Sequence, residues 1–201
     1  SIVYYASWMD KYRDTPEFRN VEHVSYVDAD MQLVDTLRKG KTNCVVELMH
    51  AIDRLKDYRN MSDSLVRLNL MYVIHIVGDM HCPSHVKYPG CKSGRADLNG
   101  KKMSYHAMWD WGVLDGAHGW SYSEYRLLLD TFSKREKAGM AKGTPREWLY
   151  ETAVACRVIY DWQRADGTYG KQFVTDTYLL PECQLILASY RLAAVLNDLF
   201  G

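Results

Sequence analysis

Two histidine–aspartate pairs with identical spacing carry the strongest chemical signal in the sequence. His75 precedes Asp79 by four residues, and His106 precedes Asp110 by four. Side chains four residues apart lie on one face of an α-helix, so each pair can be directed at a single point. Imidazole nitrogen and carboxylate oxygen, with no thiolate in the set, suit a catalytic zinc ion better than a structural one.

A third histidine follows the first pair closely. The segment reads His75-Ile-Val-Gly-Asp79-Met-His-Cys-Pro83-Ser-His85. Pro83 should end the helix, so that His85 can fold back toward the first pair. A lone histidine on an apolar helix is usually a core residue, and a lone histidine–aspartate pair is usually a surface ion pair. Two pairs and His85 around one loop favour a metal site, but spacing alone leaves the structural alternative open.

Helices must position these side chains, and the sequence contains start signals for them. A segment with helical character opens the chain at Ile2–Arg13. Cap residues or prolines precede five more apolar stripes: Asn43, Ser62, Ser121 with Glu124, Thr144 with Pro145 and Glu147, and Pro181. Strand signals are few, the best being Val24–Val27, and we expect a loop from Pro83 to Lys102. We therefore predict a single all-α domain over residues 1–201.

Composition restricts the classes of function. A chain of 201 residues can bury the core of one domain. Its net charge is zero, so no global basic field would hold a long polyanion, and nucleic acid would be held locally by metal and by stacking. No apolar run approaches the ~20 residues of a membrane-spanning helix, so we expect no membrane span. The five cysteines show no CxxC zinc pattern.

Taken together, these motifs resemble a known family. His-x-x-Gly-Asp-Met-x-x-Pro-x-His, then a loop, then His-x-x-Trp-Asp is similar to the S-one/P-one nucleases, the single-strand-specific zinc nucleases of fungi and plants with bacterial relatives. The similarity extends over nearly the whole chain, through Ala-Ser-Trp-Met-Asp10, Thr-Asn-Cys44, Ala-Cys156 and Tyr-Arg-Leu-Ala193. We expect this chain to be a bacterial member.

The resemblance implies a fold related to zinc-dependent phospholipase C and a cluster of three zinc ions. Such a cluster cleaves phosphodiester bonds in single-stranded DNA or RNA and leaves 5′-phosphates, and 3′-nucleotidase activity is a possible addition. We expect one to three zinc ions in this chain. The expected partners are single-stranded nucleic acid or nucleotides. We expect an exported protein, periplasmic or extracellular, that is a monomer.

Carried over residue by residue, the resemblance also implies roles for individual side chains. Asp10, His75 and Asp79 match the ligands of one zinc, and Asp79 matches a carboxylate that bridges to a neighbouring metal, so Asp10 and Asp79 are the expected catalytic residues. The matching ligands of a second zinc are His85, His106 and Asp110. Tyr26 and Asp28 match the residues that stack a base and hydrogen-bond its edge. Cys44 and Cys156 match a family disulfide, and Cys82 with Cys91 is a second candidate pair.

The sequence departs from the family pattern at three places. The family begins with a tryptophan and a nearby histidine that ligate one zinc, and this chain starts beyond that segment. The family histidine before the aromatic-x-Asp segment is Ser25 here, and serine is a poor zinc ligand. His23, two residues earlier, would share the face of Ser25 in an extended segment and could compensate. The family's Gly-Gly-Asn reads Gly90-Cys91-Lys92.

These departures keep two other functions open beside the nuclease. One is a phosphodiesterase for lipid head groups or other small phosphodiesters, which the neutral charge permits. The other is a degenerate relative that binds metal or ligand without turnover, which Ser25 favours.

Overall fold

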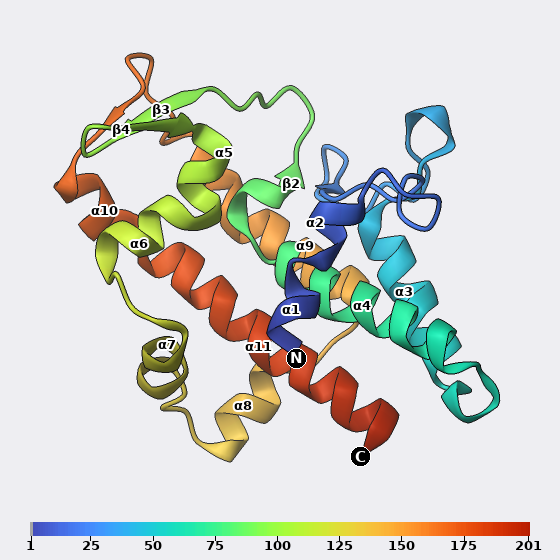
Figure 1. Ribbon diagram of the computed structural model, residues 1–201. Helices are drawn as coiled ribbons and strands as arrows, with labels where there is room; N and C mark the ends of the chain where they lie inside the picture. The colour runs from blue at the N-terminus through green and yellow to red at the C-terminus, as the bar shows by residue number, and fades with distance from the viewer. Residues whose placement is uncertain (1) are drawn as a thin grey trace.

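Helices make up most of the molecule, and the strands are short (Figure 1). The computed structural model describes residues 2–201, with side chains from residue 3 onward. The predicted mostly helical class is confirmed, with small sheets added to it.

The helix that carries the first pair, α4 (Asp63–Asp79), lies in the larger hydrophobic core. Residues 71–77 of this helix are all buried, so this part of α4 is covered by protein on every side. Helices from both ends of the chain pack against it: α1 (Ile2–Ala6), α2 (Trp8–Tyr12), α3 (Cys44–Leu55) and α11 (Leu179–Phe200). In Figure 1 the N-terminal helices lie across α4 near its C-terminal end, which brings Asp10 to the end of the helix that carries Asp79.

The second pair belongs to a smaller core, built around the buried ring of Trp109. His106 lies in α5 and Asp110 in a π-helical turn, η4. The helical elements of this region are α5 (Tyr105–Ala107), η4 (Met108–Gly112), α6 (Val113–Ala117) and α10 (Lys171–Thr177). Two clusters of buried residues therefore meet at the site, each supplying one pair.

Most of the predicted helix starts are confirmed by cap geometry. Asn43 accepts a hydrogen bond from the backbone N–H of Val45, and Ser62 precedes α4 without a side-chain cap bond. Capping boxes stand before α7 (Tyr122–Leu129) and α9 (Pro145–Cys156), as predicted, and before α8 (Lys134–Met140). Short 3-10 turns complete the helical elements: η1 (Arg38–Gly40), η2 (Tyr58–Asn60), η3 (Pro83–His85) and η5 (Arg157–Tyr160).

The predicted loop from Pro83 to Lys102 is wrong in part, because it contains strands. β2 (Val86–Lys87) pairs in parallel with β1 (Ser25–Tyr26), which lies inside the predicted strand Val24–Val27. β3 (Arg95–Leu98) and β4 (Lys101–Ser104) form a hairpin, and β5 (Thr168–Tyr169) adds to β3 in parallel. The hairpin turns at Asn99 and Gly100, which both have positive φ. Asn-Gly is the strongest short hairpin signal, and it explains this turn.

Two helix boundaries differ from the prediction. The segment Ile2–Arg13 is broken at Ser7 into α1 and α2, and α11 begins at Leu179, two residues before Pro181. Among the described helices, α11 is the one whose length and composition would allow it to cross a membrane. Its buried residues include Ala188 and Arg191, and Arg191 is 3% exposed and pairs with Glu151, so one face of α11 packs against the core.

Candidate metal centre

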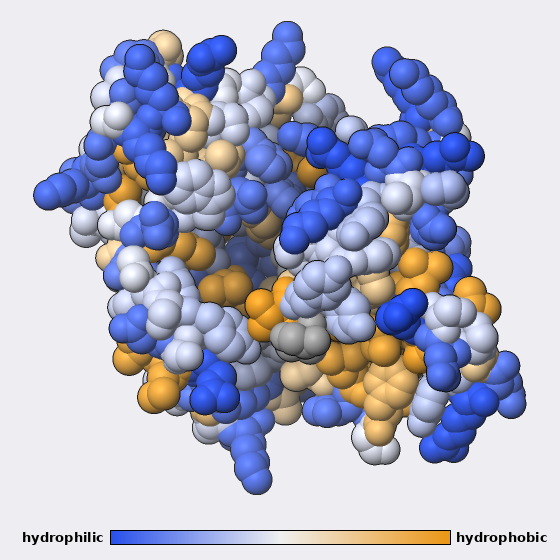
Figure 2. Space-filling view, viewed as in Figure 1, coloured by the Kyte–Doolittle hydropathy of each residue, from blue (hydrophilic) through white to orange (hydrophobic). Residues whose placement is uncertain are grey.

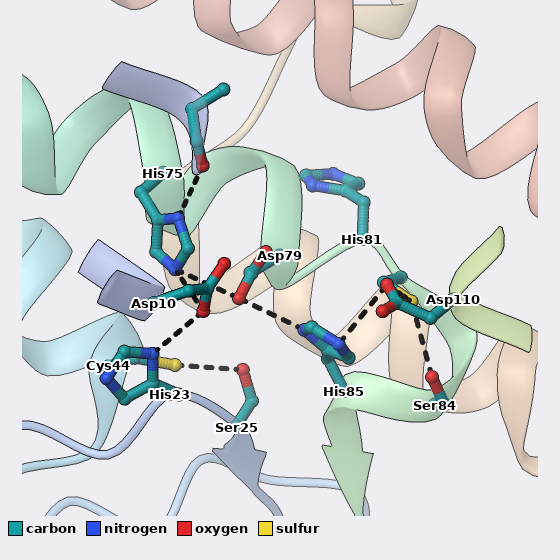
Figure 3. A network of polar contacts seen from close by, with 12 residues as sticks. Asp10, His23, Ser25, Cys44, His75, Asp79, His81, Ser84, His85 and Asp110 are labelled. Atoms are coloured by element: carbon teal, nitrogen blue, oxygen red, sulfur yellow. Dashed lines mark hydrogen bonds and ion pairs between the residues drawn. The ribbon is translucent and has the colours of Figure 1, made fainter. Parts of the chain in front are cut away.

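His75 and Asp79 meet on one face of α4, as the spacing predicts. Nε2 of His75 lies 3.1 Å from Oδ2 of Asp79. Nδ1 of His75 lies 2.6 Å from the carbonyl oxygen of Ala6, which fixes the ring and leaves Nε2 directed at the site (Figure 3). A backbone carbonyl on the far nitrogen is the usual way in which a protein orients a metal-binding histidine.

His85 returns to this point after the turn at Pro83, as predicted. Its Nδ1 lies 3.1 Å from the same Oδ2 atom of Asp79. Its Nε2 faces the other way, 3.5 Å from Oδ1 of Asp110. His85 therefore stands between the carboxylates of the two pairs, and its ring joins them into one cluster (Figure 3).

The two residues of the second pair, His106 and Asp110, contact His85 in different ways. The ring of His106 stacks on that of His85, with centroids 4.7 Å apart and an interplanar angle of 15°. Asp110 instead forms a compact ligand group with His85 and Cys82, whose ligand atoms all lie within 4.8 Å of one another. Cys82 was not among the predicted ligands, because the predicted set contains only histidines and aspartates.

Asp10 and His23 complete the other end of the cluster. Oδ1 of Asp10 lies 3.8 Å from Nε2 of His75 and 3.4 Å from Nδ1 of His23. Asp10 comes from α2, and His23 from the segment before β1. Asp10, His23 and His75 form the second compact ligand group, again within 4.8 Å. The structure therefore places Asp10 beside His75, whose Nε2 also lies near Asp79.

The buried nitrogens and oxygens of the cluster lack hydrogen bonds, which tests its fit to a cation. Within the described chain, no partner of hydrogen-bond geometry exists for Nε2 of His75, Oδ2 of Asp79 or either ring nitrogen of His85. The separations of 3.1 Å would allow such bonds, but the angles do not. Unpaired buried polar atoms cost free energy, and a divalent cation would satisfy them together. The donor set therefore fits a zinc centre.

Burial and neighbouring charges shift the pKa values of the histidines and of Asp79 in the cluster. Burial disfavours the imidazolium of His85, but the neighbouring groups Asp79 and Cys82 outweigh it and raise the pKa of His85 to about 11. Burial alone would raise the pKa of Asp79, yet the two adjacent imidazoles hold it well below its ordinary value. For His106, burial and the nearby His85 lower the pKa. The carboxylate of Asp79 therefore stays ionised between the two imidazoles.

The remaining histidine of the motif region, His81, has a structural role. His81 is turned away from the cluster (Figure 3). Its Nδ1 lies 2.7 Å from the carbonyl oxygen of Val77, and Arg191 donates to its Nε2 at 2.8 Å. Burial lowers the pKa of His81 to about 4, so the ring is a neutral link between α4 and α11.

The predicted disulfide between Cys44 and Cys156 is not formed in this structure. All five cysteines lie in the described chain as free thiols, so the second candidate pair, Cys82 with Cys91, is unbonded as well. The sulfur of Cys44 is occupied elsewhere, 3.3 Å from Oγ of Ser25. Burial raises the pKa of the Cys44 thiol to about 12.

The predicted base-binding residues follow Ser25 along the chain. Tyr26 is half-buried in β1 and pairs in register with Lys87, two residues beyond His85. Asp28 is exposed, and its Oδ1 accepts hydrogen bonds from the backbone N–H groups of Asp30 and Gln32, each at 2.9 Å. The β1–β2 pairing therefore places Tyr26 beside the segment that follows His85.

The molecular surface is hollowed on the face shown in Figure 2, near the C-terminal end of α4. A cavity of about 830 Å³ lies elsewhere, between the β3–β4 hairpin and residues 163–168. None of the described ligand groups lines it. Chemistry, rather than cavity size, marks the end of α4 as the site.

The mostly helical fold thus carries two candidate metal-ligand groups, and Asp79 lies between them. The family model for S1/P1 Nuclease matches residues 1–201, and the chain belongs to this family.

Curated relatives agree with the assignment. The chain is 26% identical to Endonuclease 2 of Arabidopsis thaliana over 184 residues, covering 80% of this chain and 63% of that protein. It is 25% identical to Endonuclease 4 of the same plant, covering 94% of this chain and 69% of the relative. It is 28% identical to Nuclease S1 of Aspergillus oryzae, covering 71% of this chain and 53% of that enzyme. The chain thus spans less than two thirds of two of these three relatives.

Proposed function

We propose that the protein is a zinc-dependent phosphodiesterase, an endonuclease that hydrolyses single-stranded DNA or RNA. One observation carries the proposal: a single oxygen of Asp79 lies 3.1 Å from ring nitrogens of both His75 and His85. A carboxylate shared by two ligand groups suits adjacent cations, and adjacent cations suit phosphodiester hydrolysis. The names of the relatives, endonucleases and a nuclease, support the same reaction class.

Two sets of residues would hold the metal. Asp10, His75 and Asp79 form one set, and the other consists of His85, His106 and Asp110, with the sulfur of Cys82 3.6 Å from Asp110. Bound zinc supplies Lewis acidity, which activates water near neutral pH and offsets the charge of the phosphodiester. Asp10 is exposed and Asp79 is partly shielded, so the cluster opens toward solvent on the Asp10 side.

The chain's own residues would position the substrate beside this cluster. Tyr26 offers a ring to a nucleobase, and stacking contributes about 1–3 kcal/mol per base without selecting sequence. The two backbone amides that bind Oδ1 of Asp28 hold this carboxylate in place for the edge of a base. Since the net charge is zero, stacking and metal contacts replace a basic surface.

Finer features of the activity belong to the same proposal. We expect 5′-phosphate products, an additional 3′-nucleotidase activity and an exported protein. Each follows from the family resemblance of the motifs that carry His75, Asp79 and His85.

The test is hydrolysis by the zinc-loaded full chain of single-stranded DNA, single-stranded RNA, duplex DNA and a small phosphodiester. We expect cleavage of the single strands, loss of cleavage after chelation, and restoration by zinc. Asp79→Asn should abolish cleavage, whereas His50→Ala, an exposed histidine outside the motifs, should retain it.

No cleavage by zinc-loaded protein would identify a binding protein without turnover. Cleavage of only the small phosphodiester would favour lipid head groups or related substrates instead of nucleic acid.

A further inference from the structure

We infer that His23 is a metal ligand of this chain and occupies the coordination place that Ser25 cannot fill. The inference deepens the proposed function, since it concerns the same metal centre. It names a ligand from a position where the family pattern has none.

The geometry brings His23 to the metal group directly. Its Nδ1 lies 3.4 Å from Oδ1 of Asp10, and its ring meets that of His75 edge-on, with centroids 5.8 Å apart. The ligand atoms of Asp10, His23 and His75 all lie within 4.8 Å of one another. Nε2 of His75 in turn lies 3.1 Å from Asp79. Two imidazoles and two carboxylates together make a four-ligand set of the kind that zinc accepts.

The buried ring nitrogens of His23 need a binding partner that the described protein atoms do not provide. Its side chain is 21% exposed, yet both ring nitrogens are inaccessible to solvent. Neither nitrogen has a hydrogen-bond partner anywhere in the described chain. A buried imidazole can satisfy one nitrogen with a backbone carbonyl, as His75 and His81 do, but His23 satisfies neither. A cation held with Asp10 and His75 would be the missing partner of one nitrogen.

Ser25 is excluded from the same role by its packing. It is fully buried, it pairs with Val86 across the β1–β2 ladder, and its Oγ lies 3.3 Å from the sulfur of Cys44. Figure 3 shows the Ser25 hydroxyl directed at Cys44, while His23 lies beside Asp10. The serine is therefore a core residue, and the imidazole reaches the metal group from two residues earlier in the chain.

The experiment measures zinc content and zinc affinity of the full chain, without reference to activity. We compare wild type with His23→Gln, which keeps much of the side-chain volume, and with His23→Ala. His50→Ala is the matched control, because His50 is an exposed histidine outside the cluster. Plasma mass spectrometry after dialysis gives zinc equivalents, and competition with a chromophoric chelator gives the affinity of each site.

We expect both His23 variants to lose about one equivalent of zinc, or to bind that ion at least ~10-fold more weakly, because even outer contacts of metal ligands have effects of this size. The Co²⁺-loaded protein should also change its visible absorption in the His23 variants and not in the control. Circular dichroism of the metal-free proteins shows whether each variant is folded. If His23→Ala is unfolded, the comparison of zinc binding rests on His23→Gln.

One exchange variant separates position 23 from position 25. The exchange His23→Ser with Ser25→His moves the imidazole to the family position, where it would face Cys44. We expect zinc content to stay at the level of His23→Gln. Unchanged zinc affinity in both His23 variants would overturn the inference. If His23→Gln loses zinc but wild type cleaves no substrate, the ligand assignment stands and the nuclease proposal fails.

Discussion

His75 and His85 reach the same carboxylate oxygen, Oδ2 of Asp79, each from 3.1 Å. One histidine lies one turn before the end of α4, in its buried part, and the other lies in the turn that follows the helix. Asp79 is the last residue of that helix, so it can face both. The two ligand groups therefore share Asp79, whereas Asp110 belongs only to the group of His85, so mutations at these two positions should have different effects.

Asp79→Asn should reduce metal binding in both groups, because the amide lacks the charge that offsets two adjacent cations. Asp110→Asn should affect only the group that contains His85. We expect zinc content to fall by more than one equivalent in Asp79→Asn and by at most one in Asp110→Asn. Plasma mass spectrometry on dialysed protein measures this. Equal losses in the two variants would contradict the shared role of Asp79.

Zinc should stabilise the fold, because it satisfies buried atoms that lack hydrogen bonds. At a free zinc concentration of about 100 times Kd, binding contributes roughly 2.7 kcal/mol to the free energy of unfolding. For a chain of this size, 1 kcal/mol shifts Tm by about 2–4 °C. We expect Tm to rise by roughly 5–11 °C, and a chelator to reverse the change. Differential scanning calorimetry that finds no shift would argue against metal at this cluster.

Replacing Tyr26 should weaken substrate binding while sparing metal binding. Loss of one stacked base costs about 1–3 kcal/mol, a factor of roughly 5 to 150 in affinity. We expect Tyr26→Ala to raise KM for single-stranded substrate with unchanged zinc content. Tyr26→Phe is the control, since it keeps a ring of similar size. If the Phe variant is as impaired as the Ala variant, stacking is not the role of this residue.

Zinc should protect Cys82 from alkylation, because its sulfur lies 3.6 Å from Oδ1 of Asp110 in the ligand group with His85. Cys183 is exposed and serves as the internal control, whose alkylation rate should not depend on zinc. Mass spectrometry of iodoacetamide-treated protein, with and without zinc, gives both rates. Equal rates at Cys82 in the two states would place this sulfur outside the metal shell.

Cys44 should react with neither alkylating agent nor Cys156 in the folded protein. Burial raises the pKa of its thiol to about 12, so almost no thiolate is present at pH 8. We expect peptide mapping, after unfolding under non-reducing conditions, to recover Cys44 as a free thiol. A peptide that joins Cys44 to Cys156 would restore the disulfide expected from the family resemblance.

The sequence by itself was sufficient for the local features. The i, i+4 spacing of His75 and Asp79 placed them on one face, because helix geometry depends only on the local backbone. Asn43 and the Thr144–Glu147 box marked helix starts for the same reason. The hairpin turn at Asn99-Gly100 is equally local. The Asn-Gly pair indicates such a turn, although the prediction for this segment was a loop.

Tertiary structure decided which distant side chains share the site. His23 reaches Asp10, and Cys82 replaces His106 in the compact group with His85 and Asp110. Ser25 lies against Cys44, and that thiol is not bonded to Cys156. Each outcome depends on how α2, β1 and α3 pack against the end of α4. Such contacts join residues far apart in the chain, and spacing alone cannot determine which side chain fills a shared space.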